Sequence, residues 1–307
     1  MTYASGGIIQ ASDYNGFVAS VNAIWGTGTG DSGYGQTSTL STIAISDTVT
    51  AAQWGPLIDR INSMRTHQTG AGTVVLTAPT AGTQINWLSA LTNEISGITA
   101  NRLSSNNATG AQVTASATNG GASWAGSSEL QATFAWTSAN AMRHFFNGGG
   151  QVYITGVNST ISGNSKSADW DIILGNNDNV GAGLVLIKAQ TSSKINGDAT
   201  PAPSSFNSNL GFYDLGTAPS LVLRQYGANA LGGYNTNYVD FTARVDVAHP
   251  NATSLIFNMK LNDPGADSFN DTVLGTVRLD AYYNPPPATL SNVWLGVTLT
   301  PAYVGQT

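Results

Sequence analysis

The chain has 307 residues, a formal net charge of −6, no cysteine and only 9% charged side chains, whereas an average soluble domain has roughly 25%. The missing cysteine excludes disulfides, thiolate metal sites and cysteine nucleophiles, and a negative chain without Lys or Arg runs argues against nucleic acid or an anionic membrane as partner. A surface built from Ser, Thr, Asn and Gly repels its own copies weakly, so we expect an assembly component that forms homo-oligomers.

Residues 1–105 are predicted to form a small helical region. Residues 1–9 lack the basic and apolar parts of a signal peptide, and no apolar run approaches the ~20 residues of a membrane helix. A first helix is predicted to begin near Ser12 and Asp13, which are candidate caps. Its apolar residues recur at spacings of three and four, which places them on one face. They are Tyr14, Phe17, Val18, Val21, Ile24 and Trp25.

A second predicted helix repeats the pattern of the first about 40 residues later. Its start is marked by a capping box, formed by Thr50 and Gln53, and by a hydrophobic staple, formed by Val49 and Trp54. Similar amphipathic helices of this kind can pack face to face. The apolar face of the second helix consists of Trp54, Leu57, Ile58, Ile61 and Met64.

A third helix is predicted over residues 85–98, with Thr83 as a candidate cap. We expect the apolar stripes of the first two helices to dock the protein to sister copies or to fixed partners. These stripes contain too many apolar residues for a short isolated arm. The predicted assembly interface consists of Tyr14, Phe17, Val21, Trp25, Trp54, Leu57, Ile58 and Ile61.

A glycine-rich segment over residues 26–36 separates the first two predicted helices. Gly28, Gly30 and Gly33 match the pattern G-x-G-x-x-G, which cradles a phosphate in other contexts. The segment follows a helix and not a strand, and it lacks the Lys-Ser or Lys-Thr ending of a phosphate loop. We therefore predict a turn-rich connector whose glycines supply positive φ angles.

After Asn106 the hydrophobic period changes to two, which predicts strands. The alternation begins with Leu130, Ala132, Phe134 and Trp136. Further strands are predicted over 141–146, 151–157, 169–174, 183–190, 209–214, 220–226, 237–248, 253–262, 272–283 and 292–303. On the 237–248 strand, the face expected to be buried consists of Val239, Phe241, Ala243, Val245 and Val247.

The predicted fold class is α+β, mainly β. A short helical N-terminal region, residues 1–105, would serve for docking and oligomerisation. A large antiparallel β-sandwich domain with a jelly-roll-like size, residues 106–307, would follow it.

The three histidines, His67, His144 and His249, lie far apart in the sequence and form no His-Glu-x-x-His motif. Each is expected to be structural, and His67 at the end of the second helix suits a cation at a helix C-terminus.

Paired carboxylates occur at Asp169 and Asp171, which flank Trp170. On a strand they would point to one face, whereas a glycosidase needs two carboxyls that face each other across roughly 5–9.5 Å. The tryptophans after residue 106 could stack on sugars, but isolated Trp residues on alternating strands usually pack in a core. They are Trp124, Trp136, Trp170 and Trp294.

One loop is a weak candidate for Ca²⁺, because Asp263, Asp267 and Asp271 place carboxylates around Pro264 and Gly265. Their spacing does not match an EF-hand loop, and a solvated hairpin loop is the preferred interpretation. We therefore predict no cofactor, no bound metal and no enzymatic activity.

Three N-terminal stretches and one later phrase resemble virion structural proteins of tailed bacteriophages, including T4-like marine and cyanobacterial phages. The N-terminal stretches are residues 9–25, 26–36 and 49–68, and the later phrase runs from Met142 to Gly150. The resemblance covers the first 70 residues well and a short piece near residue 145.

This resemblance implies a tail- or fibre-associated structural protein that is made in the host cytoplasm and released by lysis. It implies other virion proteins as partners and brings no catalytic residues. Two alternatives stay open at this point: a capsid decoration protein, and a tail module that binds a host surface glycan. The glycan alternative predicts exposed tryptophans in a groove beside carboxylates.

Overall fold

The computed structural model of the chain describes residues 9–72, 76–106, 113–121, 123–159, 165–174, 184–195, 205–226, 236–264, 272–291, 294 and 296–306. It divides into two compact units. The helical unit comprises residues 1–110, 143–150 and 286–293, and the β unit comprises 111–142, 151–285 and 294–307. Two short segments that come after residue 142 in the sequence therefore belong to the helical unit. The fold class predicted from the sequence, α+β and mainly β with a short N-terminal helical region, is confirmed.

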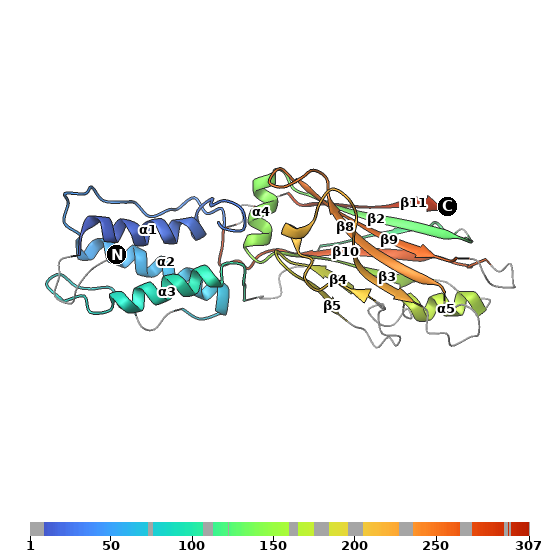
Figure 1. Cartoon of the computed structure of the whole chain (residues 1–307), viewed down its shortest axis with the longest axis horizontal. Coiled ribbons are helices and arrows are strands. Elements are labelled where there is room, and N and C mark those ends of the chain that lie inside the picture. The colour runs from blue at the N-terminus through green and yellow to red at the C-terminus, as the bar shows by residue number, and fades with distance from the viewer. Residues whose placement is uncertain are drawn as a thin grey trace. The chain divides into compact units, whose positions relative to one another are not determined.

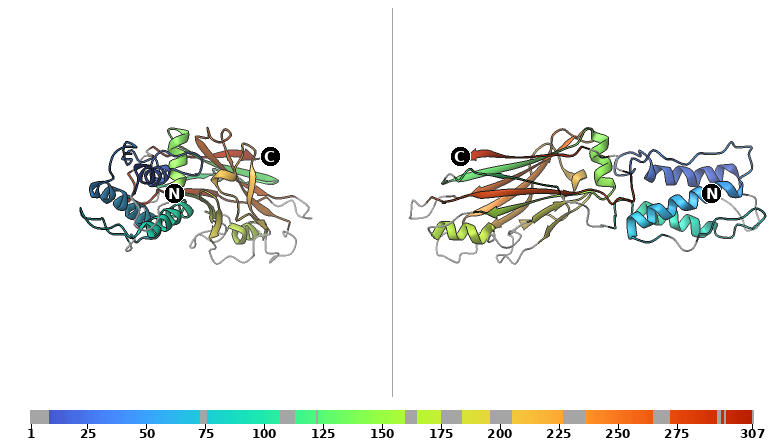
Figure 2. Two further views of the ribbon diagram at one scale, coloured as in Figure 1. Left: turned by 60° about the vertical axis from the view of Figure 1, so that its left-hand side comes forward. Right: turned by 180° about the vertical axis from the view of Figure 1, so that it is seen from behind.

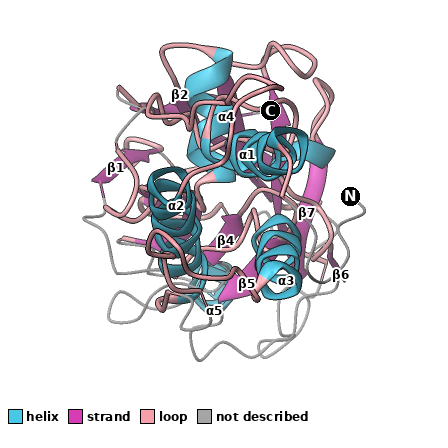
Figure 3. Ribbon diagram, turned by 90° about the vertical axis from the view of Figure 1, so that its left-hand side faces the viewer, coloured by secondary structure: helices cyan, strands magenta, loops and turns pink. Residues whose placement is uncertain are grey.

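The helical unit is built on three helices, α1 (Ala11–Trp25), α2 (Ala51–Thr69) and α3 (Leu88–Ala100). They lie side by side in Figure 1, and Figure 3 shows them almost end-on around a common centre. Tyr14 and Trp54, which occupy equivalent positions in α1 and α2, meet edge to face with ring centroids 5.5 Å apart. The repeated apolar pattern thus places matching side chains against each other.

The helix starts are set by local hydrogen bonds. At α2 the predicted capping box is confirmed, because the Thr50 N–H donates to the side-chain oxygen of Gln53 at 2.5 Å. At α1 the N-cap is Gln10, whose backbone N–H donates to the Asp13 carboxylate one turn later. Ser12 and Asp13 are therefore not N-caps. α3 begins after Trp87, and the prediction of Thr83 as its cap was wrong.

The β unit contains two antiparallel sheets. In strand order, one is β1-β10-β3-β4-β5 and the other is β11-β2-β9-β8-β7-β6. The strands are β1 (Val113–Thr118), β2 (Ser127–Ala135), β3 (Gln151–Asn158), β4 (Leu184–Ile187), β5 (Ser192–Ile195), β6 (Ser205–Phe206), β7 (Ser220–Tyr226), β8 (Tyr238–Val245), β9 (Ser254–Asn262), β10 (Val277–Asn284) and β11 (Thr298–Gln306). Figure 2 shows these strands from two further directions.

The strand pairing is partly nested and partly local. β1 pairs with β10 and β2 pairs with β9, so early strands meet late ones as in a Greek-key sandwich. In contrast, β7, β8 and β9 follow one another as antiparallel neighbours. The nested pairs are the part of this topology that resembles a jelly roll.

Alternating burial in β2, β8 and β9 forms the core of the β unit. On β8, Val239, Phe241, Ala243 and Val245 are at most 1% exposed, as the period of two predicts. β8 ends at Val245, however, and Val247 is 46% exposed, so the predicted buried face does not extend to that residue.

Three predicted strands are helical in the structure. Residues 141–146 belong to α4 (Ala139–Asn147), residues 169–174 to α5 (Ser165–Leu174), and Phe212–Asp214 to a short 3-10 helix, η1. The division between the two units falls within α4, and α5 lies next to β3 in the β unit (Figure 1).

Candidate functional site

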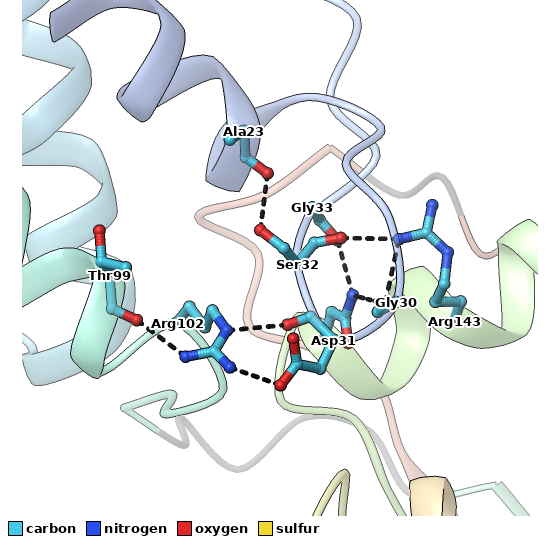
Figure 4. Close-up of polar contacts among 9 residues, drawn as sticks. Ala23, Gly30, Asp31, Ser32, Gly33, Thr99, Arg102 and Arg143 are labelled. Atoms are coloured by element: carbon cyan, nitrogen blue, oxygen red, sulfur yellow. Dashed lines mark hydrogen bonds and ion pairs between the residues drawn. The ribbon is translucent and has the colours of Figure 1, made fainter.

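The glycine-rich segment 26–36 folds back against the end of α1. The Tyr34 N–H donates to the Ile24 carbonyl at 2.8 Å. The Ser32 hydroxyl donates to the Ala23 carbonyl at 2.8 Å (Figure 4). These bonds satisfy helix carbonyls that would otherwise lack partners. The segment is therefore an ordered closed loop.

Two glycines permit the close approach of the two arms of this loop. Gly28 has φ +51° and Gly33 has φ +100°, so the prediction of positive φ angles is confirmed for both. A Cβ atom on Gly28 would lie 2.3 Å from the Ser32 carbonyl oxygen, and one on Gly33 would lie 2.3 Å from the Thr27 carbonyl oxygen. Both atoms belong to the backbone, so a side chain at either position requires the loop to open.

Arg143 from α4 binds the carbonyl oxygens of the loop. Its Nη2 atom donates to Thr27 at 2.5 Å, and its Nη1 atom donates to Ser32 at 2.7 Å and to Gly30 at 3.3 Å. The arginine is only 9% exposed. A planar guanidinium offers five donors in a fixed arrangement, and the loop supplies the matching acceptors.

Two further side chains of α4 extend this contact. The Asn147 amide donates to the carbonyls of Gly30 at 3.2 Å and Gly33 at 3.1 Å. The Nε2 atom of His144 lies 3.1 Å from the Thr27 oxygen and 2.9 Å from Nη2 of Arg143. Burial lowers the pKa of His144, and the positive charge of Arg143 lowers it further, although the Thr27 carbonyl opposes them. The imidazole is therefore neutral at neutral pH.

Arg102, which follows α3, holds the loop from another side. It forms an ion pair with the Asp31 carboxylate, and its Nε atom donates to the Asp31 carbonyl at 3.2 Å. Its Nη1 atom also donates to the Thr99 carbonyl at 3.1 Å, which ties the loop to the end of α3. Figure 4 shows Arg102 and Arg143 approaching from opposite sides. We call Arg102, Arg143 and residues 27–33 the arginine clamp.

The chemistry of the arginine clamp differs from that of a phosphate cradle. A phosphate needs N–H donors that point into the loop, whereas residues 27–33 direct carbonyl acceptors at a buried cation. The phosphate interpretation of G-x-G-x-x-G is therefore wrong here, and the segment joins elements of the helical unit.

A second buried polar contact in this unit involves His67. Its Nδ1 atom lies 2.8 Å from the hydroxyl of Thr289, and its ring meets Tyr34 edge to face at 5.0 Å. Burial lowers the pKa of His67 to about 4, although a backbone hydrogen bond at Gly148 opposes the shift. The expected role as a helix-terminal cation is wrong, because the ring is fully buried and neutral at neutral pH.

Segment 286–293 is also held by a pair of reciprocal hydrogen bonds. The Gln36 amide donates to the Ser291 carbonyl at 3.0 Å and accepts from the Ser291 N–H at 2.8 Å. Gln36 is 3% exposed. Beside it, the buried Gln68 donates to the Tyr34 hydroxyl at 2.8 Å. These contacts explain why a segment so late in the sequence belongs to the helical unit.

The side chains predicted as an assembly interface are all buried within the helical unit, and none is more than 8% exposed. They are Tyr14, Phe17, Val21, Trp25, Trp54, Leu57, Ile58 and Ile61. Their apolar area is used between α1, α2 and α3, since two amphipathic stripes with a third helix already form a closed core. An assembly role of the unit therefore has to use other, exposed side chains.

The predicted sugar-binding and carboxylate features form no open site. Trp124, Trp136, Trp170 and Trp294 are at most 5% exposed, so they belong to the core and leave no exposed tryptophan groove. Asp169 lies on α5 and is fully buried, and the arrangement of the Asp169–Asp171 pair on a strand was wrong because this segment is helical.

The candidate Ca²⁺ loop is only partly described. Asp263 is buried and pairs with Lys166 at 2.7 Å, so its carboxylate is neutralised by a cation of the chain itself. Asp267 and Asp271 lie outside the described residues. Among the described residues, no group of three His, Cys, Asp or Glu side chains could hold a metal ion.

The contacts of the arginine clamp are not among those that the sequence pattern predicts. Arg143 and Asn147 lie in the phrase Met142–Gly150, where the sequence predicts a strand over 141–146 and the structure has α4. The available signal was the spacing of Met142, Phe145 and Phe146, which is helical. It would have indicated the helix but not the carbonyl oxygens that Arg143 binds.

Comparison with known proteins found no match among protein-family models, curated proteins or solved structures. Within the part of the chain that is described, none of the helices has the length and apolar character needed to cross a membrane. The fold therefore defines a mainly β protein with a helical unit, and its function has to be argued from its own residues.

Proposed function

We propose that this chain is a structural component of a tailed-phage virion, tail- or fibre-associated, which acts by self-assembly and attachment to the particle. It would be made in the host cytoplasm and released by lysis. Its partners would be sister copies and other virion proteins.

The observation that carries the proposal is that most of the few basic side chains of this chain bind other groups of the same chain. Seven of its eleven Lys and Arg residues make hydrogen bonds, ion pairs or both within their own unit. They are Arg60, Arg65, Arg102, Arg143, Lys166, Arg224 and Arg278. The surface is therefore still poorer in free positive charge than the composition indicates. Contacts between copies would therefore use mainly uncharged side chains, which suits permanent packing.

The place of the arginine clamp in the chain supports the phage assignment. The two stretches 26–36 and Met142–Gly150, which resemble phage virion proteins, bind each other through Arg143 and Asn147. A resemblance in both stretches is expected if the clamp is one structural device. No comparable support exists for glycan binding, because the tryptophans it required are buried.

Self-association of the purified full-length chain provides one test. We expect an oligomer in sedimentation velocity that persists when the salt concentration is raised about tenfold, because salt screens only charge-based contacts. A stable monomer under both conditions would contradict self-assembly. A complex that dissociates at the higher salt would contradict the charge-poor interface.

Antibody labelling of intact particles tests the location. Label on the tail or its fibres is the expected result. Label over the head would favour the alternative of a capsid decoration protein. Particles that carry no label, while the chain is abundant in the lysate, would overturn both assignments.

A further inference from the structure

The β unit contains a buried ion pair between two segments that lie 97 residues apart in the sequence. The Nζ atom of Lys166, in the first turn of α5, is 2.7 Å from Oδ2 of Asp263, which directly follows β9. Their side chains are only 3% and 2% exposed. The free-energy cost of desolvating a buried ion pair often exceeds the Coulomb attraction between its charges. Stability alone therefore does not explain why this pair is buried.

The surroundings of the pair are tightly built. The Asp263 N–H donates to the Gly126 carbonyl at 2.6 Å, and the Ser167 hydroxyl accepts from the Leu274 N–H at 3.1 Å. Trp124 and Trp170 meet edge to face at 5.0 Å beside these segments. The pair therefore lies buried among segments that hydrogen bonds and aromatic packing hold in place.

The 2.7 Å contact between Nζ of Lys166 and Oδ2 of Asp263 lets a proton pass directly from one partner to the other. Transfer of one proton from the Lys166 ammonium to the Asp263 carboxylate gives a neutral amine and a carboxylic acid in direct contact. These are the two reactants of an amide bond. Their fixed contact removes much of the entropic cost that the same reaction has between free molecules.

A third group, Asp169, lies on the same face of α5 as Lys166, because it follows three residues later. It is fully buried, beside the side chain of Asn237. Burial raises its pKa to about 6, and the Asn237 side chain opposes part of that rise. A carboxyl group that titrates close to neutral pH can both donate and accept a proton.

We propose that Lys166 and Asp263 become joined by an intramolecular amide bond, with Asp169 as the general acid–base. The neutral Lys166 nitrogen attacks Cγ of Asp263 and forms the N–C bond. Protonated Asp169 gives its proton to the departing hydroxyl group as the C–O bond breaks. Asp169 then takes one proton from the nitrogen and returns to its starting form. The net change is ammonium plus carboxylate to amide plus one water, without any oxidant or co-reactant.

The bond would connect α5 to the end of β9 covalently. A link across so long a stretch of chain restricts the unfolded ensemble, in the way that a disulfide does, in a protein that has no cysteine. The inference does not depend on the proposed virion role, since it concerns the β unit alone.

Intact-mass spectrometry of the folded full-length protein, recorded under denaturing conditions, tests the proposal. We expect a mass lower than that of the sequence by one water molecule. Tryptic digestion should yield a branched peptide that joins the Lys166 and Asp263 segments, with no cleavage after Lys166. A full sequence mass after prolonged incubation of the folded protein would overturn the proposal.

Three variants assign the roles. Asp263→Asn should form the same amide with loss of one ammonia instead of water. Asp169→Asn, which keeps the shape of the side chain, should stop or strongly slow the loss of water. Water loss at the original rate in that variant would overturn the role of Asp169. The matched control Lys260→Met should lose one water like the original chain, and failure to do so would contradict the assignment to Lys166.

Discussion

Among the single residues of the helical unit, Arg143 has the largest set of contacts to the glycine-rich loop. It brings a permanent positive charge into a site where only 9% of the residue is exposed. Carbonyl dipoles of the loop face this charge. Hydrogen bonds to charged groups contribute about 1.5–3 kcal/mol each, so the loop depends on the shape of the guanidinium as much as on its charge.

Replacement of this arginine by lysine tests that dependence. In Arg143→Lys one ammonium replaces the planar fork, so at least one of the Thr27 and Ser32 carbonyls loses its partner. We expect the helical unit to lose about 1–3 kcal/mol of stability. Hydrogen–deuterium exchange should show faster exchange at Tyr34 and its neighbours.

The matched control is Arg244→Lys on β8, where the residue is only partly buried. It should leave exchange in residues 26–36 unchanged. If the two variants behave alike, the contacts of Arg143 with the loop carbonyls do not stabilise it.

Buried His67 predicts a pH dependence of the helical unit. Its folded pKa of about 4 lies below the ordinary value of 6.5, so the unfolded chain binds a proton more readily. Stability is therefore full above pH 6.5 and falls as the pH decreases toward 4, by about 3 kcal/mol in total. The lowered pKa of His144 acts in the same direction.

The pH effect can be separated from other groups by comparing the original chain with His67→Gln. Hydrogen exchange in α2, corrected for intrinsic rates, should show a smaller loss of protection on acidification in the variant. His249→Gln, in the β unit, should keep the full loss. An equal loss in the original chain and in His67→Gln would refute the assignment to His67.

At the scale of elements, α1 holds an extended segment beside it through two asparagines. The Asn15 side chain donates to the Ile43 carbonyl at 2.8 Å and accepts from the Ile43 N–H at 2.9 Å. Asn22, two turns later, makes the same pair of bonds with Leu40 at 2.8 and 2.9 Å. Each amide imitates a neighbouring strand, which satisfies the backbone of a segment that belongs to no sheet.

The variant Asn22→Asp removes the donor of this pair and places a carboxylate against the Leu40 carbonyl. We expect a loss of about 1–3 kcal/mol in the stability of the helical unit, because the partly buried Leu40 carbonyl loses its donor and faces a carboxylate. Chemical denaturation of the full chain measures it. Asn93→Asp on the exposed side of α3 is the control and should change stability by less than about 0.5 kcal/mol. Equal effects of the two changes would contradict the pairing role.

The elements themselves were predictable where one face is apolar and the other polar. The stripe on α2 and the alternation on β8 are of this kind, and both were identified from the sequence. α4 and α5 were assigned to strands because their apolar residues form short runs. Yet Trp170, Ile173 and Leu174 have the helical spacing of i, i+3 and i+4. On α4 every residue from 141 to 147 is buried, and such continuous burial masks the period on which these predictions depend.

The arginine clamp could not be predicted from the sequence, because its acceptors are backbone carbonyls, which every residue possesses. Only the positive φ angles of Gly28 and Gly33 had a sequence signal. The hydrogen bonds between Gln36 and Ser291 also have no sequence signal, since 255 residues separate the two partners. Contacts of this kind are determined by the tertiary fold and have no local pattern.

For the whole molecule, the low charge and its internal use connect the residue contacts to the proposed role. With most of its arginines and lysines engaged internally, the chain has few cationic side chains left for contacts with other molecules. Close packing beside identical copies would then rely mainly on hydroxyl and amide groups. The same property is unfavourable for a freely diffusing protein, which relies on charge for solubility.

Quantitative mass spectrometry of gradient-purified, salt-washed phage particles from the lysed host tests the central claim most directly. The proposal predicts that this chain stays with the particles in a fixed ratio to the major capsid protein. Recovery of the chain only in the soluble fraction of the lysate would contradict it.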